Sequence, residues 1–352
     1  MKKIEVDISA QNLSGRGGTE TVVSYVLNNA FIGEHCTFNV LLTGKYSDAS
    51  WFSESSNLRN YRIVKNSSKI VKLLKSAMFY FKSDADVILV LGTGQILIAT
   101  LIKKIFKKKY KVVSWMHFSI FDANFINTKY LVMADYHLAI SSEIKNQLIE
   151  LKVPADRIEV IYNPVAKQNN QVMRKTSGVV ELVYIGRVQL DEQKNMREML
   201  VGLSKYLADW HLSVFGSGET ERLQVLAQQL NISSRISIYG WRSDPWSYIE
   251  SADVLLLTSR FEGFGMVLAE AISRGLPCVS SDCPVGPSDI VKNGINGELY
   301  ITGDCNDFLR ALNVAVRNPN YKNIADSLNN LYEDNYIRRF VEGVENSINE
   351  TV

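Results

Sequence analysis

Short runs of consecutive apolar residues, separated by helix-length amphipathic stretches, constrain the fold of this chain more than any other feature. Two of these runs, Val87–Leu91 and Val254–Thr258, are apolar at nearly every position and do not alternate with polar residues. A strand that is covered on both faces needs such a run, and strands of this kind occur in parallel sheets. Helix-length segments between the strands indicate β-α-β units. The sequence therefore predicts an α/β fold built on parallel sheets.

The candidate strands form two series. The first is Lys3–Ile8, Thr37–Leu42, Asp86–Leu91, Lys111–Trp115, Tyr136–Ala139 and Ile158–Tyr162. The second is Glu181–Ile185, His211–Phe215, Ile236–Tyr239, Asp253–Thr258, Pro277–Ser280 and Gly297–Tyr300. Between the series, Val165–Gly178 is polar and aperiodic, which is typical of a linker. We therefore expect two doubly wound, Rossmann-like domains, 1–165 and 166–330, that face each other across a cleft, and a final helix in 331–352 that packs back towards the N-terminal domain.

The length and composition of the chain indicate how many domains it has and in which compartment it works. The chain has 352 residues, more than the roughly 250–300 at which a single core usually stops growing. It contains no run of about 18 uncharged apolar residues, and Glu5 and Asp7 stand where a signal peptide needs an apolar stretch. The four cysteines form no C-x-x-C pair, so we expect reduced thiols. These features predict a cytoplasmic protein.

One strand of the second series leads into a glycine-containing loop that carries two carboxylates. Glu262 lies in this loop, between the candidate strand that ends at Thr258 and a following helix that contains Glu270. Gly263 and Gly265 let the backbone approach a ligand, and the start of the helix offers free N–H groups to an anion. A solvated loop glutamate and an ordinary helix glutamate are the alternative interpretation. The strand–loop–helix context favours a ligand site.

Cations and a histidine follow other strand ends. Arg187 comes directly after the strand that ends at Ile185, and Lys194 follows in a polar loop, so that both can face one anion; the alternative is two surface cations. His117 lies just past another strand end, although a lone histidine is often structural. The turn Ser14–Glu20 contains Gly17 and Gly18 before a helix, but it lacks the full dinucleotide fingerprint because position 20 is Glu.

The segment FEGFGMVLAEAISRGLPCVSSDCPVGPSDIV, which begins at Phe261, resembles the E-x7-E segment of retaining glycosyltransferase family 4, whose members have the GT-B fold. SWMHFSI, VIYNPV and LLLTSRFEGFGM extend the resemblance over about residues 112 to 300. Within the family, these segments are similar to lipopolysaccharide-core α-1,6-galactosyltransferases. The resemblance implies an acceptor-side domain 1–165 and a nucleotide-sugar-binding domain 166–330. It implies a retaining hexosyltransferase that moves galactose or glucose from a UDP-sugar to an acceptor of lipopolysaccharide or a similar surface glycan.

The resemblance also implies roles for individual residues. Glu262 would meet hydroxyls of the donor sugar and Glu270 the ribose hydroxyls, while Arg187 and Lys194 would grip the diphosphate. The implied catalytic residues are His117, Arg187, Lys194 and Glu262. The implied donor-binding residues are Gly17, Gly18, Arg187, Lys194, Trp241, Arg242, Glu262, Gly263, Phe264, Gly265, Met266 and Glu270. Trp241 or Arg242 would cover the base, with core packing as the alternative for Trp241.

No metal or other cofactor is expected. Arg187, Lys194 and helix amino ends would neutralise the leaving diphosphate. Asp84-Ala85-Asp86 reads D-x-D, a metal–diphosphate motif in other glycosyltransferases. It precedes the apolar strand at Val87–Leu91, however, and so belongs to the edge of the sheet that does not bind ligands.

The N-terminal half is basic. Residues 1–165 carry 21 Lys and Arg residues against 14 Asp and Glu residues, although the net charge of the chain is only +2. The stretches Lys65–Lys75 and Lys103–Lys111 mix lysines with apolar residues, which favours peripheral contact with the anionic inner face of a membrane. A solvated basic face and a nucleic-acid patch are alternatives, and nothing else indicates nucleic acid.

Three rival functions remain open. A UDP-N-acetylhexosamine epimerase of GT-B fold would need paired acid and base groups around the sugar, for which His117 is the single candidate. A nicotinamide-dependent oxidoreductase would need the dinucleotide fingerprint that the turn at Gly17 lacks. A non-catalytic sugar-binding protein would use the same donor-binding residues without turnover.

Overall fold

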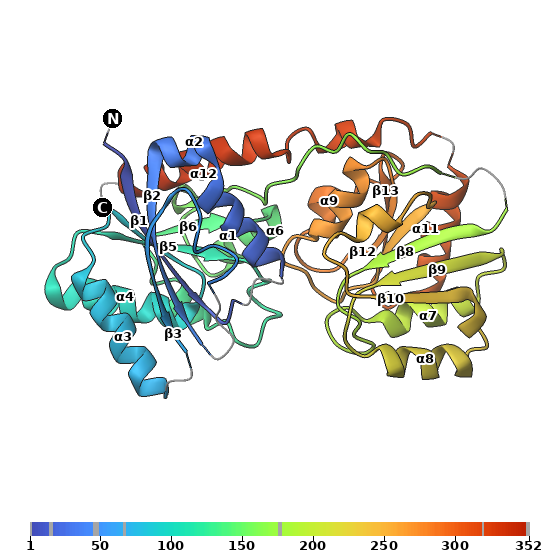
Figure 1. The fold of residues 1–352 in the computed structure, drawn as a ribbon, viewed down its shortest axis with the longest axis horizontal. Coiled ribbons are helices and arrows are strands. Elements are labelled where there is room, and N and C mark those ends of the chain that lie inside the picture. The colour runs from blue at the N-terminus through green and yellow to red at the C-terminus, as the bar shows by residue number, and fades with distance from the viewer. Residues whose placement is uncertain are drawn as a thin grey trace. The chain divides into compact units, whose positions relative to one another are not determined.

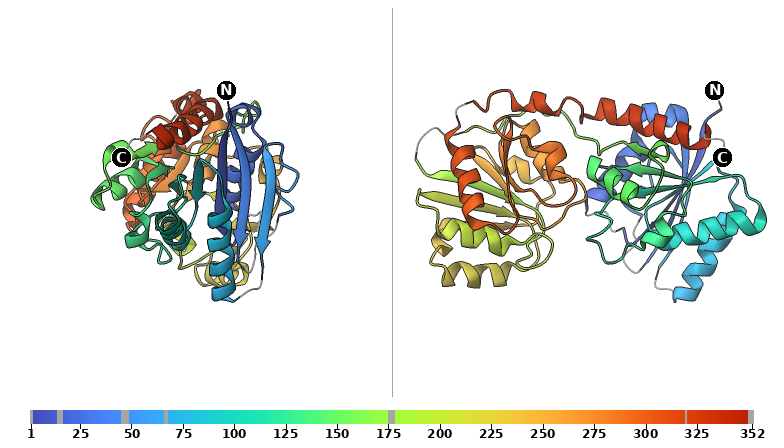
Figure 2. Two further views of the ribbon diagram at one scale, coloured as in Figure 1. Left: turned by 90° about the vertical axis from the view of Figure 1, so that its left-hand side faces the viewer. Right: turned by 180° about the vertical axis from the view of Figure 1, so that it is seen from behind.

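The computed structural model of the chain describes residues 2–13, 17–44, 49–65, 68–174, 178–318 and 320–349. It divides into an N-terminal unit, Met1–Pro164 with Glu333–Val352, and a C-terminal unit, Val165–Tyr332. Each unit is built on one parallel sheet with helices packed on it (Figures 1 and 2). The predicted α/β class with two doubly wound, Rossmann-like domains is confirmed.

The sheet of the N-terminal unit has the strand order β3-β2-β1-β4-β5-β6-β7, and every neighbouring pair is parallel. Its strands are β1 Ile4–Gln11, β2 Cys36–Thr43, β3 Leu58–Val64, β4 Val87–Val90, β5 Lys111–Met116, β6 Tyr136–Ala139 and β7 Ile158–Val160. Its helices are α1 Gly18–Asn28, α2 Ala30–His35, α3 Lys69–Lys82, α4 Thr93–Phe106, α5 Thr128–Leu131, α6 Ser142–Glu150, the short 3-10 turn η1 Ala155–Arg157 and α12 Glu333–Asn349.

The sequence does not predict strand β3, which forms the edge of this sheet. Its sequence is LRNYRIV, and the four residues Arg59–Arg62 are exposed. An edge strand has a neighbour on one side only and needs no continuous apolar run. For this reason it lacks the signal by which the other strands are found.

The sheet of the C-terminal unit has the order β10-β9-β8-β11-β12-β13, again with parallel neighbours. Its strands are β8 Val180–Ile185, β9 Trp210–Phe215, β10 Ile236–Gly240, β11 Val254–Leu257, β12 Cys278–Ser281 and β13 Gly297–Tyr300. Its helices are α7 Met196–Ser204, α8 Thr220–Gln229, α9 Met266–Ser273, α10 Pro287–Ile290 and α11 Cys305–Arg317, with 3-10 turns η2 Ser233–Arg235, η3 Pro245–Tyr248 and η4 Ile324–Leu328.

The stretch expected to be a linker lies along the C-terminal unit as far as residue 174. Val165 forms a bridge with Tyr332, and Val172 donates its backbone N–H to the carbonyl of Arg274 at 2.8 Å. Both valines are buried. Although most of this stretch is polar, these two buried valines attach it to the C-terminal unit. Residues 175–177 lie outside the described residues.

The last helix, α12, belongs to the core of the N-terminal unit. It contacts α2 and the strands β4, β5, β6 and β7, and the figures show it lying over this unit (Figures 1 and 2). Tyr336, Phe340 and Val344 are buried, and the ring of Phe340 lies 5.6 Å from that of Trp115. The N-terminal sheet therefore needs residues from both ends of the chain to cover it.

Replacing Phe340 by alanine tests this dependence. A buried Phe→Ala substitution typically costs about 3–5 kcal/mol in the free energy of unfolding. We expect Phe340→Ala to lower the unfolding free energy of the N-terminal unit by that amount, measured by urea denaturation followed by circular dichroism. Arg338→Ala, at an exposed position of the same helix, should change the unfolding free energy by less than about 0.5 kcal/mol. Equal unfolding free energies for the two variants would contradict the role of α12.

Candidate active site

The order of strands in the C-terminal sheet reverses between β8 and β11, which are neighbours. In open α/β sheets, ligands bind beyond the carboxyl ends of the strands at such a reversal. Arg187 and Lys194 lie in the segment that follows β8, and Glu262 lies in the loop that follows β11. The structure therefore brings three of the residues singled out in the sequence to the place where this fold binds ligands.

Lys194 and Glu262 form a mostly buried ion pair. The Nζ atom of Lys194 donates to Oε1 of Glu262 at 2.6 Å, and the two side chains are only 14% and 8% exposed. The hydroxyl of Ser259 donates to the same oxygen at 2.5 Å. Charge-assisted hydrogen bonds of this kind are short and strong, and together they set the direction of the carboxylate. Ser259 carries no signal in the sequence that marks it as part of the site.

Gln193 joins the two loops that carry this pair. Its carbonyl accepts from the backbone N–H of Arg260 at 2.8 Å, and its side-chain amide donates to the carbonyl of Phe261 at 3.0 Å. The Oε1 atom of Gln193 accepts from Arg187 at 2.7 Å. Gln193 therefore orients the arginine and fixes the spacing of the loops. No sequence signal marks Gln193, because its partners Arg260 and Phe261 are distant along the chain.

The loop that carries Glu262 ends at the amino end of helix α9. Gly265 caps this helix with a φ of 92°, a left-handed conformation that favours glycine, and no side chain caps the helix. A Cβ atom on Gly286 would collide with the carbonyl of Phe264, so this glycine allows the close approach of the neighbouring loop. Gly263–Met266 thus form a backbone turn at a helix start that is suited to an anion.

Glu270 lies in the second turn of α9 and is held by an aromatic residue. The indole N–H of Trp246 donates to Oε2 of Glu270 at 3.0 Å, and the guanidinium of Arg274 lies 4.6 Å from the centre of the Trp246 ring. Burial raises the pKa of the Glu270 carboxyl, and the hydrogen bond from Trp246 opposes this rise. Trp246 was missed in the sequence, where Trp241 was the indole singled out.

Aromatic rings gather at the carboxyl ends of β9 and β10. Phe215 and Tyr239 stack with ring centres 4.6 Å apart and an interplanar angle of 9°. Arg242 lies 5.4 Å from the centre of the Tyr248 ring. Trp241 is 56% exposed, so core packing, the alternative interpretation of this residue, is wrong. Trp241 and Arg242 therefore offer an accessible surface at the same strand ends as the site.

In the N-terminal unit, the strand order reverses between β1 and β4. Helix α1 follows β1, with Gly17 as its N-cap and Gly18 as its first residue, and the acidic Glu20 lies in its first turn, where it complements the helix dipole. A Cβ atom on Gly17 would lie 2.7 Å from a carboxylate oxygen of Glu20. Ser14–Arg16, the first part of the predicted turn, lie outside the described residues.

His117 follows the carboxyl end of β5 and is only 6% exposed. Its Nε2 atom is buried and has no hydrogen-bond partner among the described residues. Burial lowers the pKa of the imidazole to about 3, so the ring is neutral near pH 7. A buried polar atom without a partner costs about 1–3 kcal/mol, and such atoms often mark positions where a ligand completes the site.

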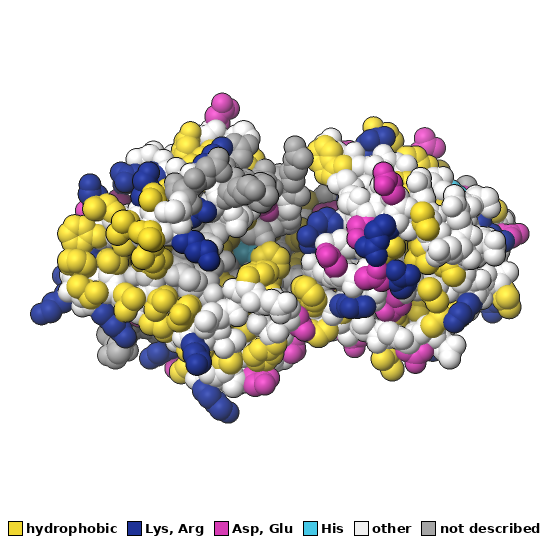
Figure 3. Space-filling model, turned by 90° about the horizontal axis from the view of Figure 1, so that it is seen from below, with side chains coloured by type: hydrophobic (Ala, Val, Ile, Leu, Met, Phe, Trp, Pro, Cys, Tyr) yellow, Lys and Arg dark blue, Asp and Glu magenta, His cyan; other side chains and the backbone are white. Residues whose placement is uncertain are grey.

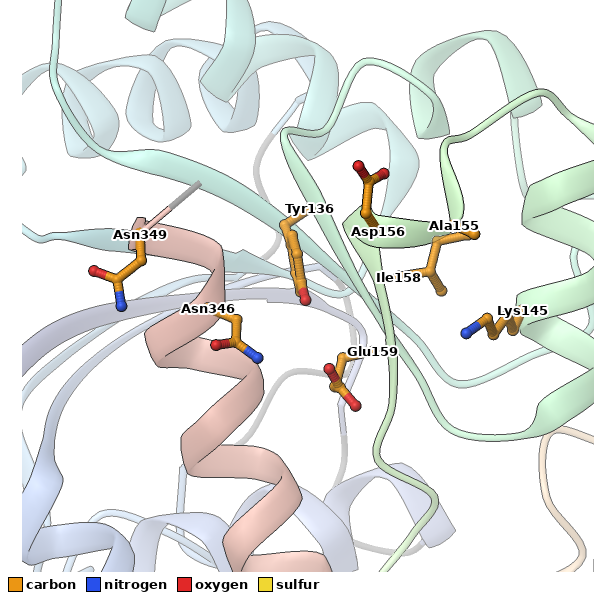
Figure 4. Close-up of a pocket in the computed structure, with 8 residues that line it drawn as sticks. All are labelled: Tyr136, Lys145, Ala155, Asp156, Ile158, Glu159, Asn346 and Asn349. Carbon is orange, nitrogen blue, oxygen red and sulfur yellow. The ribbon is translucent and has the colours of Figure 1, made fainter. Parts of the chain in front are cut away.

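A hollow of about 480 Å³ in the N-terminal unit lies at the other edge of the sheet (Figure 4). Tyr136 and Ile158, which begin β6 and β7, line it together with Asn346 of α12. It therefore lies at the amino ends of the strands, whereas His117 follows a carboxyl end. No residue singled out as a site residue in the sequence lines this hollow.

The D-x-D sequence lies at the amino end of its strand, as the sequence predicts. Asp86 directly precedes β4, and its Oδ2 atom accepts from the backbone N–H of Glu5 at 2.9 Å. Asp84 lies 3.6 Å from the ammonium group of Lys108. Among the described residues, no group of three or more His, Cys, Asp or Glu side chains is arranged to hold a metal ion. Both aspartates thus have structural partners.

Comparison with known proteins identifies the family. Residues 167–335 match the family described as glycosyl transferases group 1, and residues 40–168 match glycosyltransferase family 4. The chain is 33% identical to lipopolysaccharide 1,6-galactosyltransferase of Escherichia coli over 96% of both chains. It is 32% identical to the protein of the same name from Salmonella typhimurium, over 89% of this chain and 90% of that one.

Solved structures agree with this relationship. The apo form of the lipopolysaccharide outer core galactosyltransferase WaaB superposes with a TM-score of 0.87 at 30% identity, over 97% of this chain and 99% of that one. HepE of Anabaena in complex with UDP superposes with a TM-score of 0.77 over 96% of this chain and 99% of that one; at 15% identity this likeness shows the fold alone. The chain belongs to glycosyltransferase family 4 and is a glycosyltransferase of GT-B fold.

Proposed function

We propose that this glycosyltransferase moves a hexose, galactose or glucose, from a UDP-sugar to a saccharide acceptor of lipopolysaccharide or a similar surface glycan. The bond is made with retention of configuration and without a metal ion. The mostly buried Lys194–Glu262 pair beyond the strand-order reversal is the observation that carries this proposal. The two relatives named lipopolysaccharide 1,6-galactosyltransferase support the choice of sugar and acceptor.

Lys194 and Arg187 act on the diphosphate. An ammonium group has three donors, and Lys194 uses one of them on Glu262, which leaves two for phosphate oxygens. Gln193 orients the guanidinium of Arg187, and the amino end of α9 adds backbone N–H groups. These groups are in place before the reaction and stabilise the charge that grows on the leaving diphosphate.

Glu262 binds the transferred sugar. Its Oε1 atom accepts from Lys194 and Ser259, whereas its Oε2 atom accepts no hydrogen bond from the described residues. This second oxygen is directed by the two bonds to the first and accepts from a hydroxyl group of the hexose. A charge-assisted hydrogen bond of this kind contributes about 1.5–3 kcal/mol.

The remaining donor contacts follow from the same arrangement. Glu270, held at Oε2 by Trp246, accepts from the ribose hydroxyl groups through Oε1, while Trp241 or Arg242 covers the uracil ring. In the N-terminal unit, the backbone of Gly17 and Gly18 at the start of α1 contacts the diphosphate or the acceptor. The neutral imidazole of His117 makes a hydrogen bond to the transferred sugar.

The chemical step is a displacement on one face of the sugar. The bond from the anomeric carbon to the UDP oxygen breaks, and a bond from that carbon to the acceptor oxygen forms on the same face. The proton of the acceptor hydroxyl passes to the departing diphosphate, so the products are the glycoside and UDP. Glu262 and Glu270 are occupied with hydroxyl groups in this arrangement, and no carboxylate is required as a nucleophile.

The acceptor is reached at a membrane surface. Lys65–Lys75 and Lys103–Lys111 supply positive charge that attracts anionic lipid on the cytoplasmic side. In the structure, Lys65 follows the end of β3 and Lys69–Lys75 lie in α3, while the second stretch spans the end of α4 and the start of β5. No helix among the described residues has the length and apolar character needed to span a membrane. The proposed contact is therefore peripheral.

Lys194→Ala and Glu262→Gln test the diphosphate and sugar roles. Loss of one charge-stabilising group commonly lowers kcat by about 10²–10³, and we expect a fall of at least this size in each variant. Release of UDP with an acceptor saccharide present is the measurement. Lys205→Ala, at an exposed position of the same unit, is the matched control. Near-normal transfer by a correctly folded Lys194→Ala variant would refute the assignment.

Donor choice is tested by thermal unfolding with UDP-Gal, UDP-Glc and UDP-GlcNAc. A ligand at 100 times its Kd stabilises the folded protein by about 2.7 kcal/mol, so the Tm should rise with UDP-Gal or UDP-Glc and less with UDP-GlcNAc. Incubation with donor alone then separates transfer from epimerisation. Formation of an isomerised UDP-sugar without acceptor would establish the epimerase instead.

The pH dependence of His117→Gln tests whether the imidazole is neutral. The unfolded chain takes up a proton near pH 6.5, whereas the folded chain does so only near its pKa of about 3. His117 therefore destabilises the parent protein increasingly as the pH falls from 6.5 towards 3. The unfolding free energy of the variant minus that of the parent protein should therefore rise by about 1.4 kcal/mol for each pH unit below 6, compared with its value at pH 8. A constant difference would show that the folded imidazole titrates normally.

A further inference from the structure

Helix α3 presents its apolar side chains to solvent. The residues of this helix that are buried are Ser76 and Tyr80, one turn apart. Ile70 and Leu74 are 70% and 61% exposed, and Leu73, Met78 and Phe81 are also exposed. Positions 70, 74, 78 and 81 follow the spacing of one helix face, so the apolar stripe lies away from the core.

Helix α4 continues this apolar stripe. Ile105, 67% exposed, Leu101 and Phe106 are its exposed large apolar residues. The two helices pack on each other, and the rings of Phe81 and Phe106 meet edge to face with their centres 4.7 Å apart. The exposed large apolar residues of the two helices thus form one α3–α4 apolar surface, which comprises Ile70, Val71, Leu73, Leu74, Met78, Phe81, Leu101, Ile105 and Phe106. Contiguous exposed apolar surfaces of this kind usually mark an interaction site.

The charge around this surface is of one sign. Residues 68–111 contain ten lysines and two acidic residues, Asp84 and Asp86. The two aspartates are engaged, Asp84 by Lys108 and Asp86 by the backbone N–H of Glu5. Figure 3 shows hydrophobic side chains gathered on one face of the N-terminal unit, with Lys and Arg side chains around them. A partner that covers this face has to be both apolar and anionic.

We infer that the α3–α4 apolar surface inserts into the headgroup region of an anionic lipid bilayer. Lysines beside the apolar stripe place their ammonium groups at the phosphates while their stems lie along the acyl boundary. A second copy of the chain would bring two lysine-rich faces together, which like-charge repulsion opposes. This inference deepens the proposed membrane contact and rests on the proposed glycolipid acceptor. It adds that insertion of apolar side chains, as well as charge, holds the protein there.

Insertion and charge attraction respond differently to salt. Electrostatic attraction to lipid is screened over about 3 Å at 1 M salt, whereas burial of apolar side chains is not screened. A contact made by lysines alone would therefore be lost at high salt. A contact that also buries Ile70 and Leu74 would be weakened and would persist in part.

Flotation of the full chain with lipid vesicles tests the inference. The vesicles contain phosphatidylcholine with or without about 30% phosphatidylglycerol, an anionic fraction chosen to give a strongly negative surface potential. We expect binding to the anionic vesicles at low salt and a reduced but measurable bound fraction at 1 M salt. Ile70→Ser/Leu74→Ser should weaken partition at least about tenfold, because each fully buried side chain of this size is worth roughly tenfold in a partition constant.

Matched variants separate the two contributions. Lys72→Gln/Lys75→Gln should weaken binding at low salt and leave the fraction bound at 1 M salt unchanged. Leu207→Ser removes an exposed apolar side chain from the C-terminal unit and should leave binding unchanged. Equal binding of Ile70→Ser/Leu74→Ser and the parent chain, or no binding to anionic vesicles, would overturn the inference. The inference would also be overturned if the parent chain is a dimer and the Ile70→Ser/Leu74→Ser variant is a monomer that binds lipid as the parent does.

Activity on a water-soluble acceptor saccharide distinguishes this inference from the proposed function. All the surface variants should transfer hexose to a soluble acceptor at the parent rate, because none of these residues belongs to the site. Vesicle binding without transfer by the parent chain would contradict the proposed function and leave the surface assignment standing. Transfer without vesicle binding would contradict the surface assignment alone.

Discussion

The C-terminal site depends on the ion pair between Lys194 and Glu262. Burying two opposite charges is costly unless their geometry is good and further hydrogen bonds satisfy them. Ser259 supplies one such bond to Glu262, and Gln193 ties the loop of Lys194 to the loop of Glu262. The pair therefore holds the segments after β8 and β11 in one arrangement. Both partners are directed before any ligand arrives, which is the condition for electrostatic stabilisation of a leaving group.

The position of this pair follows from the order of strands. In both units the chain builds outward from one central strand, β1 or β8, and then returns to its other side with β4 or β11. The connections on the two sides lead away from each other, which opens a space beyond the strand ends. Gly17 and Gly18 lie after β1, and Arg187 and Lys194 lie after β8. Each unit thus has groups that can bind an anion at the point where its strand order reverses: backbone N–H groups in the N-terminal unit and cationic side chains in the C-terminal unit.

The N-terminal unit has a second specialised region at α3 and α4. The lysines and large apolar side chains of α3 do not contribute to the core, because the buried residues of this helix are Ser76 and Tyr80. The same unit carries α12 from the far end of the chain, which covers the sheet with Tyr336, Phe340 and Val344. The core of the unit is therefore completed by the C-terminal helix, whereas the apolar side chains of α3 lie outside that core.

The parallel sheets could be predicted from the amino-acid sequence, because strands such as Val87–Val90 and Val254–Leu257 are covered on both faces and must be apolar throughout. It also indicated Arg187, Lys194 and Glu262, which stand directly after such strands or resemble a family motif. The other features depend on contacts that form when the chain folds. Edge strand β3 has little apolar signal. Gln193 and Trp246 acquire their roles through partners that are distant along the chain, and the bond from Ser259 to Glu262 depends on how their shared loop folds. The outward stripe of α3 could not be read from periodicity, because periodicity locates an apolar face and the sheet decides whether that face is buried.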